Sequence, residues 1–467
     1  MLKFDLFVLG SGPGGQRAAV QAAKLGKSVG ISERREALGG AWINTGTIPS
    51  KTFREAVLYL TGYGQRGMYG DGSNGREKIT MDDLLSRCRA VIKHEIEVIR
   101  AQMKRNGVTL LNGAASFVDP HHLVVQSGTG STTEIEAGAI VIATGTVPAA
   151  PPGVPVNGET VIDSDGILTL KELPRTMTVV GAGVIGVEYA TMFGALGVKI
   201  TVVDKRARLL DFVDAEIAAS LSYQMRNNNC TLRLNEDVAD VTIEGPRRAV
   251  ATLKSGKKII SDVLLYSIGR VGATNDLKLD NAGLTADDRG RLKVNAAFQT
   301  AQPHIYAVGD VIGFPSLAST SLEQGRQAAC HAFNVPLVPI STEFPYGIYS
   351  IPEISMVGRT EEALMADNVH YEVGLAHYKE IARGAILGDH SGMLKLLIDI
   401  ETRKILGVHI IGTGATELIH IGQAVLAFGG TLDYFVDAVF NYPTFAECYK
   451  VAALDGYNKI GPAKARI

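Results

Sequence analysis

The sequence predicts an α/β fold, and two glycine-rich segments are the main reason. Each follows a short apolar run that is typical of a β-strand and precedes a helical pattern, first at residues 10–15 and again at residues 181–186. Length is the third observation. The 467 residues are too many for one hydrophobic core, and a prior of roughly 150 residues per domain suggests about three domains. We therefore expect two similar α/β units and a further domain.

The first glycine segment is predicted to be the turn between a strand and a helix. Residues 4–9 are apolar-rich, the letters GSGPGG follow, and alanines then recur at helical spacing. Gly10 permits the tight turn, Gly12 lets a pyrophosphate approach the backbone, and Gly15 lets the helix lie close to the strand. A second apolar run ends at Glu33, about 20 residues further on, where the carboxylate can accept hydrogen bonds from ribose hydroxyls. This pattern is the fingerprint of a Rossmann-type dinucleotide-binding unit.

The second glycine segment repeats the design. A strand at residues 178–180 precedes the letters GAGVIG, a helix containing Glu188 follows, and a strand at residues 199–203 leads to Asp204. A lone GxGxxG is weak evidence, but each copy here lies in a strand, turn, helix, strand and acid context. The pair implies two bound dinucleotides.

The order of the remaining segments predicts that one nucleotide domain interrupts the other. An apolar run at residues 139–145 is followed by a proline-rich stretch at 147–153, which we expect to be a hinge because proline cannot continue a sheet or a helix. A similar break follows residues 263–268 at Gly269-Arg270, and a strand at residues 304–308 ends at Gly309-Asp310. The expected domains are residues 1–147 with 270–343, the inserted residues 148–269, and residues 344–467.

The last domain is predicted to be of the α+β type, without a nucleotide of its own. It shows strand-like runs at residues 354–358, 393–399 and 405–412 and a helical pattern through 418–425, but no glycine fingerprint.

Composition excludes several other functions. A net charge of −2 gives no field that would gather nucleic acid or a membrane surface, and no apolar run reaches the length of a membrane span. The N-terminus shows no cleavable signal, so we expect a cytoplasmic protein. The cysteines form no CxxC or metal-ligand spacing, which predicts neither a disulfide framework nor a metal site. They are Cys88, Cys230, Cys330 and Cys448.

Several segments together resemble the pyridine-nucleotide disulfide oxidoreductases, the group of lipoamide dehydrogenase and glutathione reductase. The resemblance implies an FAD domain, an inserted NAD(P) domain and a dimerisation domain, with each active site completed by the partner chain of a homodimer. The segments that carry it are residues 10–15, GGAWINTGTIPSK at 39–51, ATG at 143–145, residues 181–188, Gly309-Asp310 and NYPTFAE at 441–447.

Two departures from that family predict that the chain has lost the half-reaction with a disulfide substrate. Trp42 and Thr47 occupy the positions of the two cysteines that exchange electrons with a disulfide substrate, and neither side chain can supply a thiolate. Tyr442 stands where the family carries a histidine base, five residues before Glu447. A neutral tyrosine, with an ordinary pKa of about 10, cannot serve as that base.

The residues that the resemblance assigns to the flavin and nicotinamide sites are retained. The resemblance places Lys51 beside the flavin N5, paired with Glu188, where an ammonium stabilises electron density on the reduced flavin. The candidate catalytic residues are Lys51, Glu188, Tyr442 and Glu447. The implied FAD contacts are Gly10, Gly12, Gly14, Gly15, Glu33, Gly40, Trp42, Thr47, Lys51, Gly113, Thr144, Gly145, Asp310 and Ala318. The implied NAD(P) contacts are Gly181, Gly183, Val184, Ile185, Gly186, Asp204, Lys205, Arg206, Val238, Gly269 and Arg270.

Within the family the chain is most similar to the soluble pyridine-nucleotide transhydrogenases, which reduce FAD with one nicotinamide cofactor and reoxidise it with the other. The shared letters are GTIPSK followed by TFREAV, NYPT, and VAALDG at 451–456. Trp42 departs even from this subgroup, where a cysteine often persists, and we expect it to pack near the flavin. The implied cofactors are FAD, NAD and NADP.

The residues after the second strand give a mixed signal on the nicotinamide cofactor. Asp204 favours NAD, because a carboxylate accepts from the ribose 2′-hydroxyl and repels a 2′-phosphate. Lys205, Arg206 and Arg208 follow, and cations there bind such a phosphate. A transhydrogenase needs both properties, whereas a solvated basic loop is the alternative interpretation.

Three functions stay open on the sequence. The first is transhydrogenation between nicotinamide nucleotides through FAD. The second is an NAD(P)H-dependent reductase of a quinone or dye, or an oxidase, which would use the same flavin and lose the same cysteines. The third is a catalytically idle, FAD-bound interaction protein.

Overall fold

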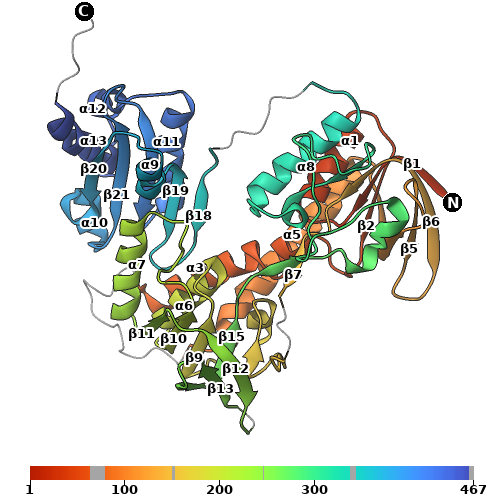
Figure 1. Ribbon diagram of the computed structural model, residues 1–467, viewed down its shortest axis with the longest axis horizontal. Helices are drawn as coiled ribbons and strands as arrows, with labels where there is room; N and C mark the ends of the chain where they lie inside the picture. Colours follow the sequence, from red (N-terminus) through yellow and green to blue (C-terminus); the bar gives the residue numbers. More distant parts are fainter. Residues whose placement is uncertain (64–78, 150–152, 246, 337–342, 462–467) are drawn as a thin grey trace, which may run out of the picture. The chain divides into compact units, whose positions relative to one another are not determined.

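The computed structural model describes residues 1–63, 79–149, 153–245, 247–336 and 343–461 (Figure 1). These residues form two compact units. No helix among them is both long enough and apolar enough to cross a bilayer. The first unit combines Met1–Phe53, Asp82–Ala150 and Gly269–Ile340, and the second combines Arg54–Met81, Pro151–Ile268 and Ser341–Ile467.

A mixed sheet is the centre of the first unit. Its strands run in the order β3 (Thr109–Asn112), β2 (Val29–Glu33), β1 (Leu2–Leu9), β6 (Thr132–Ile142), β5 (His122–Gln126) and β4 (Ala114–Phe117), and β17 (Ile305–Ala307) pairs with β6. Strands β3, β2, β1, β6 and β17 pair in parallel, whereas β5 and β4 are antiparallel. The parallel part is buried on both faces, since Leu6 and Val8 enter one core cluster while Phe7 and Leu9 enter another.

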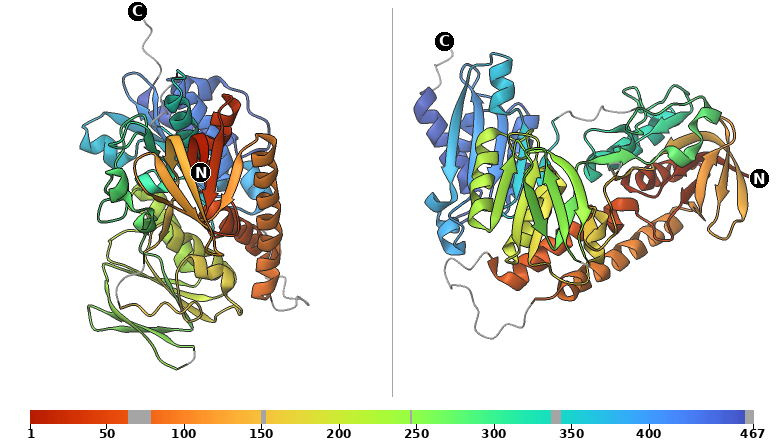
Figure 2. Two further views of the ribbon diagram at one scale, coloured as in Figure 1. Left: turned by 90° about the vertical axis from the view of Figure 1, so that its right-hand side faces the viewer. Right: turned by 60° about the horizontal axis from the view of Figure 1, so that its bottom comes forward.

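Helices cover the sheet of the first unit. Helix α1 packs against α8 (Figure 1), and both contribute alanines to the core cluster that contains Leu6. The long helix α5, orange in Figure 2, adds Ile99 and Met103 to the same cluster. The helices are α1 (Pro13–Lys24), α2 (Gly40–Asn44), α3 (Thr47–Thr61), which continues into the second unit, α5 (Met81–Arg105) and α8 (Ala318–Ala332), with 3-10 turns at Asn275–Leu277, Leu279–Ala282 and Gly309–Ile312.

The second unit contains the second glycine turn on a parallel sheet. Its strand order is β11 (Cys230–Leu234), β10 (Lys199–Asp204), β9 (Thr176–Val180), β15 (Val263–Tyr266) and β8 (Val161–Ile162). An antiparallel meander accompanies it, formed by β12 (Val238–Ile243), β13 (Ala249–Leu253) and β14 (Lys258–Ser261). The helical elements are α6 (Val184–Ala195), α7 (Ala215–Asn227) and a 3-10 turn at Asp165–Thr169.

An antiparallel sheet covered by helices completes the second unit. Helices α11 and α13 pack on this sheet and enclose a core that contains Tyr449 and Phe435 (Figure 1). The strand order is β18 (Tyr346–Ile348), β19 (Ile354–Gly358), β22 (Ile405–Ile411), β21 (Met393–Asp399) and β20 (Tyr371–His377). The helical elements are α9 (Glu361–Ala366), α10 (Ala382–Leu387), α11 (Ala415–Ala427), α12 (Leu432–Asp437), α13 (Glu447–Ile460) and a 3-10 turn at Tyr378–Glu380.

The chain forms a short two-stranded ribbon where it leaves and re-enters the first unit. Strand β7 (Thr146–Pro148) pairs antiparallel with β16 (Arg270–Gly272), and the Ala149 N–H donates to the carbonyl of Gly269 at 3.0 Å. The expectation that proline excludes sheet structure here was wrong for Val147 and Pro148. Pro148 is the last residue of its strand, where the missing N–H costs little. Of the other expected hinge residues, Ala149 and Gly153 lie in no helix or strand, and residues 150–152 lie outside the described residues.

Candidate nucleotide-binding sites

The first glycine turn is so closely packed that side chains are excluded at two of its positions. Gly10 has φ of +100°, and a Cβ atom there would lie 2.5 Å from the carbonyl oxygen of Ala143. A Cβ at Gly15 would lie 2.0 Å from the carbonyl oxygen of Gly10. Glycine is therefore required at both positions, so that α1 can begin directly beside the end of β1.

The Glu33 carboxylate at the end of β2 holds this turn in place. It is 6% exposed, and its Oε2 accepts from the Ser11 N–H at 3.1 Å and the Ser11 hydroxyl at 2.6 Å. Its Oε1 accepts from the Arg35 N–H at 2.9 Å. The acid thus joins the glycine turn to the segment that follows β2.

The second glycine turn has the same construction. Gly181 has φ of +112°, and a Cβ at Gly186 would lie 2.0 Å from the carbonyl oxygen of Gly181. Asp204 occupies the position that corresponds to Glu33. Its Oδ2 accepts from the Ala182 N–H at 2.5 Å, and its Oδ1 accepts from the Arg206 N–H at 2.8 Å. Burial acts to raise the pKa of Asp204, but hydrogen bonds from Arg206 and Ala182 outweigh it and lower that pKa. Asp204 is therefore ionised at neutral pH.

Both helices that follow the turns begin without a side-chain cap. Gly12 and Gly183 are the N-cap residues of α1 and α6, and neither supplies a side-chain cap. A Cβ at Gly12 would have only the Ala143 carbonyl oxygen within 4 Å, at 3.9 Å, and one at Gly183 only the Arg206 guanidinium, also at 3.9 Å. Open space before an uncapped helix N-terminus fits a pyrophosphate group.

Further polar groups of the first unit fit a bound dinucleotide. The hydroxyls of Thr45 and Thr144 are buried and have no partner among the described residues, so a bound FAD would supply one. Gly113 directly follows β3 and donates its N–H to the Glu33 carbonyl at 2.8 Å. Gly40 begins α2, and Ala318 begins α8, which has no side-chain cap.

Asp310 lies in a polar cluster at the ribbon of the first unit. Its Oδ2 accepts from the Thr146 hydroxyl at 3.3 Å, and Arg270 donates to that hydroxyl at 2.9 Å and to the Thr146 carbonyl at 2.9 Å. Burial raises the pKa of Asp310, and Arg270 opposes that rise. Arg270, expected to contact NAD(P), therefore belongs with Gly269 to the first unit.

The other predicted NAD(P) contacts lie in the second unit. Val184 and Ile185 form the first turn of α6, and Lys205 and Arg206 directly follow β10. Val238 is the first residue of β12.

The positions of the missing redox cysteines lie on the first unit. Trp42, in α2, is half-buried and packs against the core cluster that contains Leu6. Thr47 is exposed and begins α3, and Lys51 follows one turn later as a half-buried residue. Glu188 is buried in α6 of the second unit, where its Oε1 accepts from the Tyr349 N–H at 2.8 Å. The pairing of Lys51 with Glu188 stays a prediction.

None of the chain's cysteines supplies a thiolate in place of the missing pair. All four are buried. Cys88 contacts the carbonyl oxygen of Pro49, at the start of α3, with its sulfur at 3.6 Å. Burial raises the pKa of Cys88 to about 11 and those of Cys230 and Cys448 to about 12, and it also raises the pKa of Cys330. They are therefore thiols at neutral pH.

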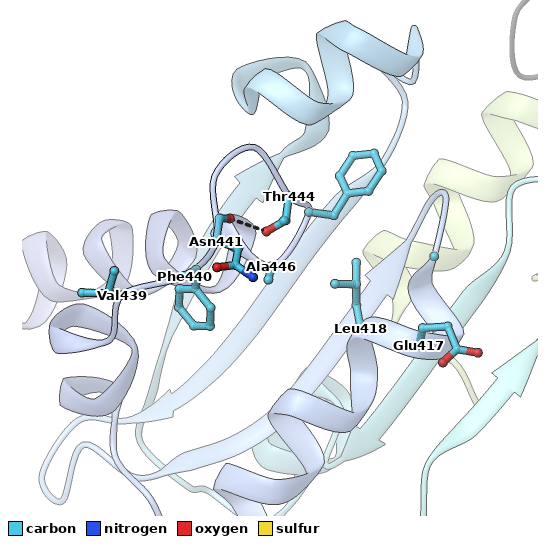
Figure 3. A pocket seen from close by; sticks show the side chains of 9 residues that line it. Glu417, Leu418, Val439, Phe440, Asn441, Thr444 and Ala446 are labelled. Atoms are coloured by element: carbon cyan, nitrogen blue, oxygen red, sulfur yellow. Dashed lines mark hydrogen bonds between the residues drawn. The ribbon is translucent and has the colours of Figure 1, made fainter.

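The C-terminal motif and the start of α11 line an open cavity of about 530 Å³ in the second unit (Figure 3). The Thr444 hydroxyl donates to the Asn441 carbonyl at 2.7 Å, which closes the turn that presents Tyr442. Tyr442 is 74% exposed. Glu447 begins α13, and its Oε2 is buried without a partner in the described part of the chain. The cavity is lined by Gly414, Glu417, Leu418, Val439, Phe440, Asn441, Thr444, Phe445 and Ala446.

Two family models match the chain. The model described as pyridine nucleotide-disulphide oxidoreductase matches residues 4–325, and the dimerisation domain of the same description matches residues 344–453. The chain belongs to the pyridine nucleotide-disulphide oxidoreductase family. Its cofactors are those of the family, FAD and NAD(P), and the dimerisation domain makes it a homodimer.

Relatives in this family match nearly the whole chain. A protein named soluble pyridine nucleotide transhydrogenase from Mycobacterium bovis (strain BCG / Pasteur 1173P2) is 55% identical over 461 residues, 98% of each chain. A protein of the same name from Yersinia pestis (strain Pestoides F) is 46% identical over 466 residues, again 98% of each.

Two solved structures share the fold. LpdA from Mycobacterium tuberculosis is 27% identical with a TM-score of 0.89, covering 97% of this chain and 99% of that one. The Cu(II) complex of the HOCl-induced flavoprotein disulfide reductase RclA from Escherichia coli is 26% identical with a TM-score of 0.88, covering 97% and 100%. The predicted α/β fold class is confirmed.

The sequence analysis missed several residues that hold the two glycine turns and their neighbouring loops through hydrogen bonds. Ser11 and Ala182 offer the N–H groups that Glu33 and Asp204 accept, and their position after the first glycine of each turn could have suggested it. The contact of Glu362 with Arg208, at 2.8 Å, joins parts of the chain far apart in sequence and left no sequence signal.

Proposed function

We propose that the protein is an FAD-dependent pyridine nucleotide transhydrogenase that passes hydride from one nicotinamide nucleotide to another without a redox-active disulfide. The observation that carries the proposal is the pairing of two complete dinucleotide turns with Trp42 and Thr47 at the cysteine positions. When bound, FAD supplies the chemistry by accepting a hydride from one nicotinamide and returning it to another. The name of the 55% identical relative supports the same activity.

The chain's own residues bind and orient the cofactors in this proposal. The turn at Gly10 and the Glu33 carboxylate hold the FAD, with the remaining contacts proposed from the sequence. The turn at Gly181 and the Asp204 carboxylate hold the nicotinamide nucleotide. Lys51, positioned by Glu188, places a positive charge beside the flavin. Tyr442 and Glu447 face the flavin of the partner chain, where no proton acceptor for a dithiol is needed.

The proposal includes the arrangement of the chain and its place in the cell. The FAD domain comprises residues 1–147 and 270–343, the NAD(P) domain residues 148–269, and the dimerisation domain residues 344–467. The protein acts in the cytoplasm on small nicotinamide nucleotides, with no metal, nucleic acid or membrane partner.

An anaerobic titration tests the function directly. NADPH should bleach the flavin absorbance, and an oxidised NAD analogue should then restore it. No long-wavelength band of the kind that a thiolate gives beside a flavin should appear. Reoxidation only by a quinone or dye would indicate a reductase instead. A flavin that neither NADH nor NADPH bleaches would indicate an interaction protein.

N-ethylmaleimide should leave the transhydrogenase activity unchanged, whether the protein is treated as purified or after reduction with NADPH. The reagent attacks thiolates, and all four cysteines are buried thiols with raised pKa values. The activity is measured over the treatment time, with a dithiol-dependent disulfide reductase as the positive control. Time-dependent loss that requires prior reduction would show that a cysteine takes part in the reaction.

A further inference from the structure

The ribose-binding acid of the second turn is already fully hydrogen-bonded. Besides the N–H groups of Ala182 and Arg206, the Asp204 carboxylate accepts from the Arg206 side chain, from Nε at 2.9 Å on Oδ1 and from Nη2 at 2.7 Å on Oδ2. A carboxylate offers about four acceptor positions. A ribose hydroxyl can therefore donate to Asp204 only when Arg206 releases one of them.

Arg206 is held by a second carboxylate. Its Nη1 donates to Oδ1 of Asp211 at 3.0 Å, so the guanidinium lies between Asp204, which is 6% exposed, and Asp211, which is 54% exposed. Its Nη2 also lies 3.9 Å from the position of a Cβ on Gly183. The guanidinium is thus beside the glycine turn, and the group of three carries one more negative than positive charge.

The nearby Arg208 serves a different purpose. Its Nη1 donates to Glu362 at 2.8 Å, and its Nη2 donates to the backbone carbonyl of Asp211 at 2.6 Å. Glu362 also accepts the Ala215 N–H at 3.0 Å. Arg208 therefore holds the loop that carries Asp211. Of these two arginines, Arg206 is the one whose guanidinium lies beside the second glycine turn.

We propose that Asp211 is a specificity-determining residue that sets how well the site accepts NADP(H) relative to NAD(H), an inference that rests on the proposed function. A 2′-phosphate must take the Arg206 guanidinium away from Asp211 and must approach the negative charge of Asp211. NAD(H) lacks that phosphate. When its ribose displaces Arg206 from Asp204, Asp211 still holds the guanidinium. Asp211 thus weakens NADP(H) binding without weakening NAD(H) binding.

The substitution Asp211→Asn removes the negative charge of Asp211 while keeping the size of the side chain. Asparagine keeps an oxygen for Arg206 Nη1 and leaves the backbone carbonyl that holds Arg208 in place. We expect the apparent Kd of NADPH, from the rate of flavin reduction in the holoenzyme, to fall about two- to fivefold, while that of NADH changes less than about twofold. The difference should shrink at high salt, because this pair is exposed to solvent.

Two further variants separate a specific effect from a general one. Glu172→Gln removes a carboxylate from a more exposed pair with Arg247 in the same unit and should change neither Kd. Asp211→Asn introduced into an Arg206→Gln protein should alter the Kd of NADPH less than it does alone, since only the direct repulsion between Asp211 and the 2′-phosphate then remains.

Several results would overturn the inference. They are an equal change for NADH and NADPH, no change for either, or an undiminished effect without Arg206. If the unmodified protein fails to exchange hydride between the two nucleotides, the proposed function fails instead.

Discussion

Gly183→Ala should lower kcat/KM for both NADH and NADPH about 10- to 100-fold while the protein keeps its FAD. The backbone of Gly183, with φ of −79° and ψ of −176°, suits alanine. The nearest atom to the new methyl group is Arg206 Nη2 at 3.9 Å. The methyl group therefore clashes with no protein atom, and instead fills the space before α6 that the pyrophosphate requires.

Stopped-flow reduction of the flavin measures this loss for each nucleotide. Gly12→Ala is the matched variant of the first turn, because its backbone also suits alanine and only the Ala143 carbonyl oxygen lies near, at 3.9 Å. It should lose FAD rather than the response to nicotinamide nucleotides. Gly128→Ala, at an exposed position with nothing within 4 Å, is the control. Unchanged reduction of Gly183→Ala would mean that neither nucleotide binds at the second turn.

Lys395→Met should lower the free energy of unfolding by about 3–5 kcal/mol. Lys395, in β21, is 1% exposed, and its ammonium lies 3.0 Å from Asp214 and 2.9 Å from Glu216 and also pairs with Glu361. Asp214 is 1% exposed as well. Removal of the ammonium leaves that carboxylate buried without its partner, whereas the more exposed Glu216 and Glu361 regain water.

The loss should depend on pH. Burial acts to lower the pKa of Lys395, but the surrounding carboxylates outweigh burial and raise that pKa. The stabilisation that Lys395 gives is therefore complete below the ordinary lysine pKa of about 10.4. Burial likewise acts against ionised Asp214, but His409 and Lys395 lower its pKa, so its contribution is complete above about pH 4. In the variant, Asp214 gains a proton more readily. The difference from the unmodified protein should be smaller at pH 5 than at pH 8.

Urea unfolding followed by circular dichroism measures both effects. Adding Asp214→Asn to Lys395→Met should restore much of the stability, because asparagine is neutral and still caps α7, where Asp214 Oδ1 accepts the Glu216 N–H at 3.1 Å. A Lys395→Met protein as stable as the original, or a double variant no better than the single, would contradict this account of the buried charges.

The sequence predicted features that depend on neighbours along the chain. The strands at 354–358 and 393–399 occur at their predicted bounds, because apolar residues in a run identify a buried strand. Both glycine turns were predictable for the same reason, since glycines, strand, helix and acid lie within about 30 residues of one another.

Features that depend on distant partners were not predictable. Lys395 interrupts an apolar strand, and its burial follows from carboxylates that lie far away in sequence, including Asp214. The sequence left open whether Arg206 binds a 2′-phosphate or belongs to a solvated basic loop. In the structure it binds Asp204 and Asp211. Pro148 joined a strand only because Arg270, more than a hundred residues later, supplies the other half of the ribbon.

That ribbon also determines how the residues that carry the second glycine turn are joined to the first unit. The chain leaves the first unit after Ala149 and re-enters it at Gly269, and these two residues are hydrogen-bonded neighbours. The segment between them therefore begins and ends at the same place. A module with adjoining ends can be exchanged for another without stretching any connection or cutting the host sheet. At the β7–β16 pair the chain therefore both enters and leaves the residues that carry the second glycine turn. The ion pairs of Asp214 with Lys395 and of Arg208 with Glu362 hold the same residues to the C-terminal part of the second unit, so an exchange at this point would also have to replace those pairs.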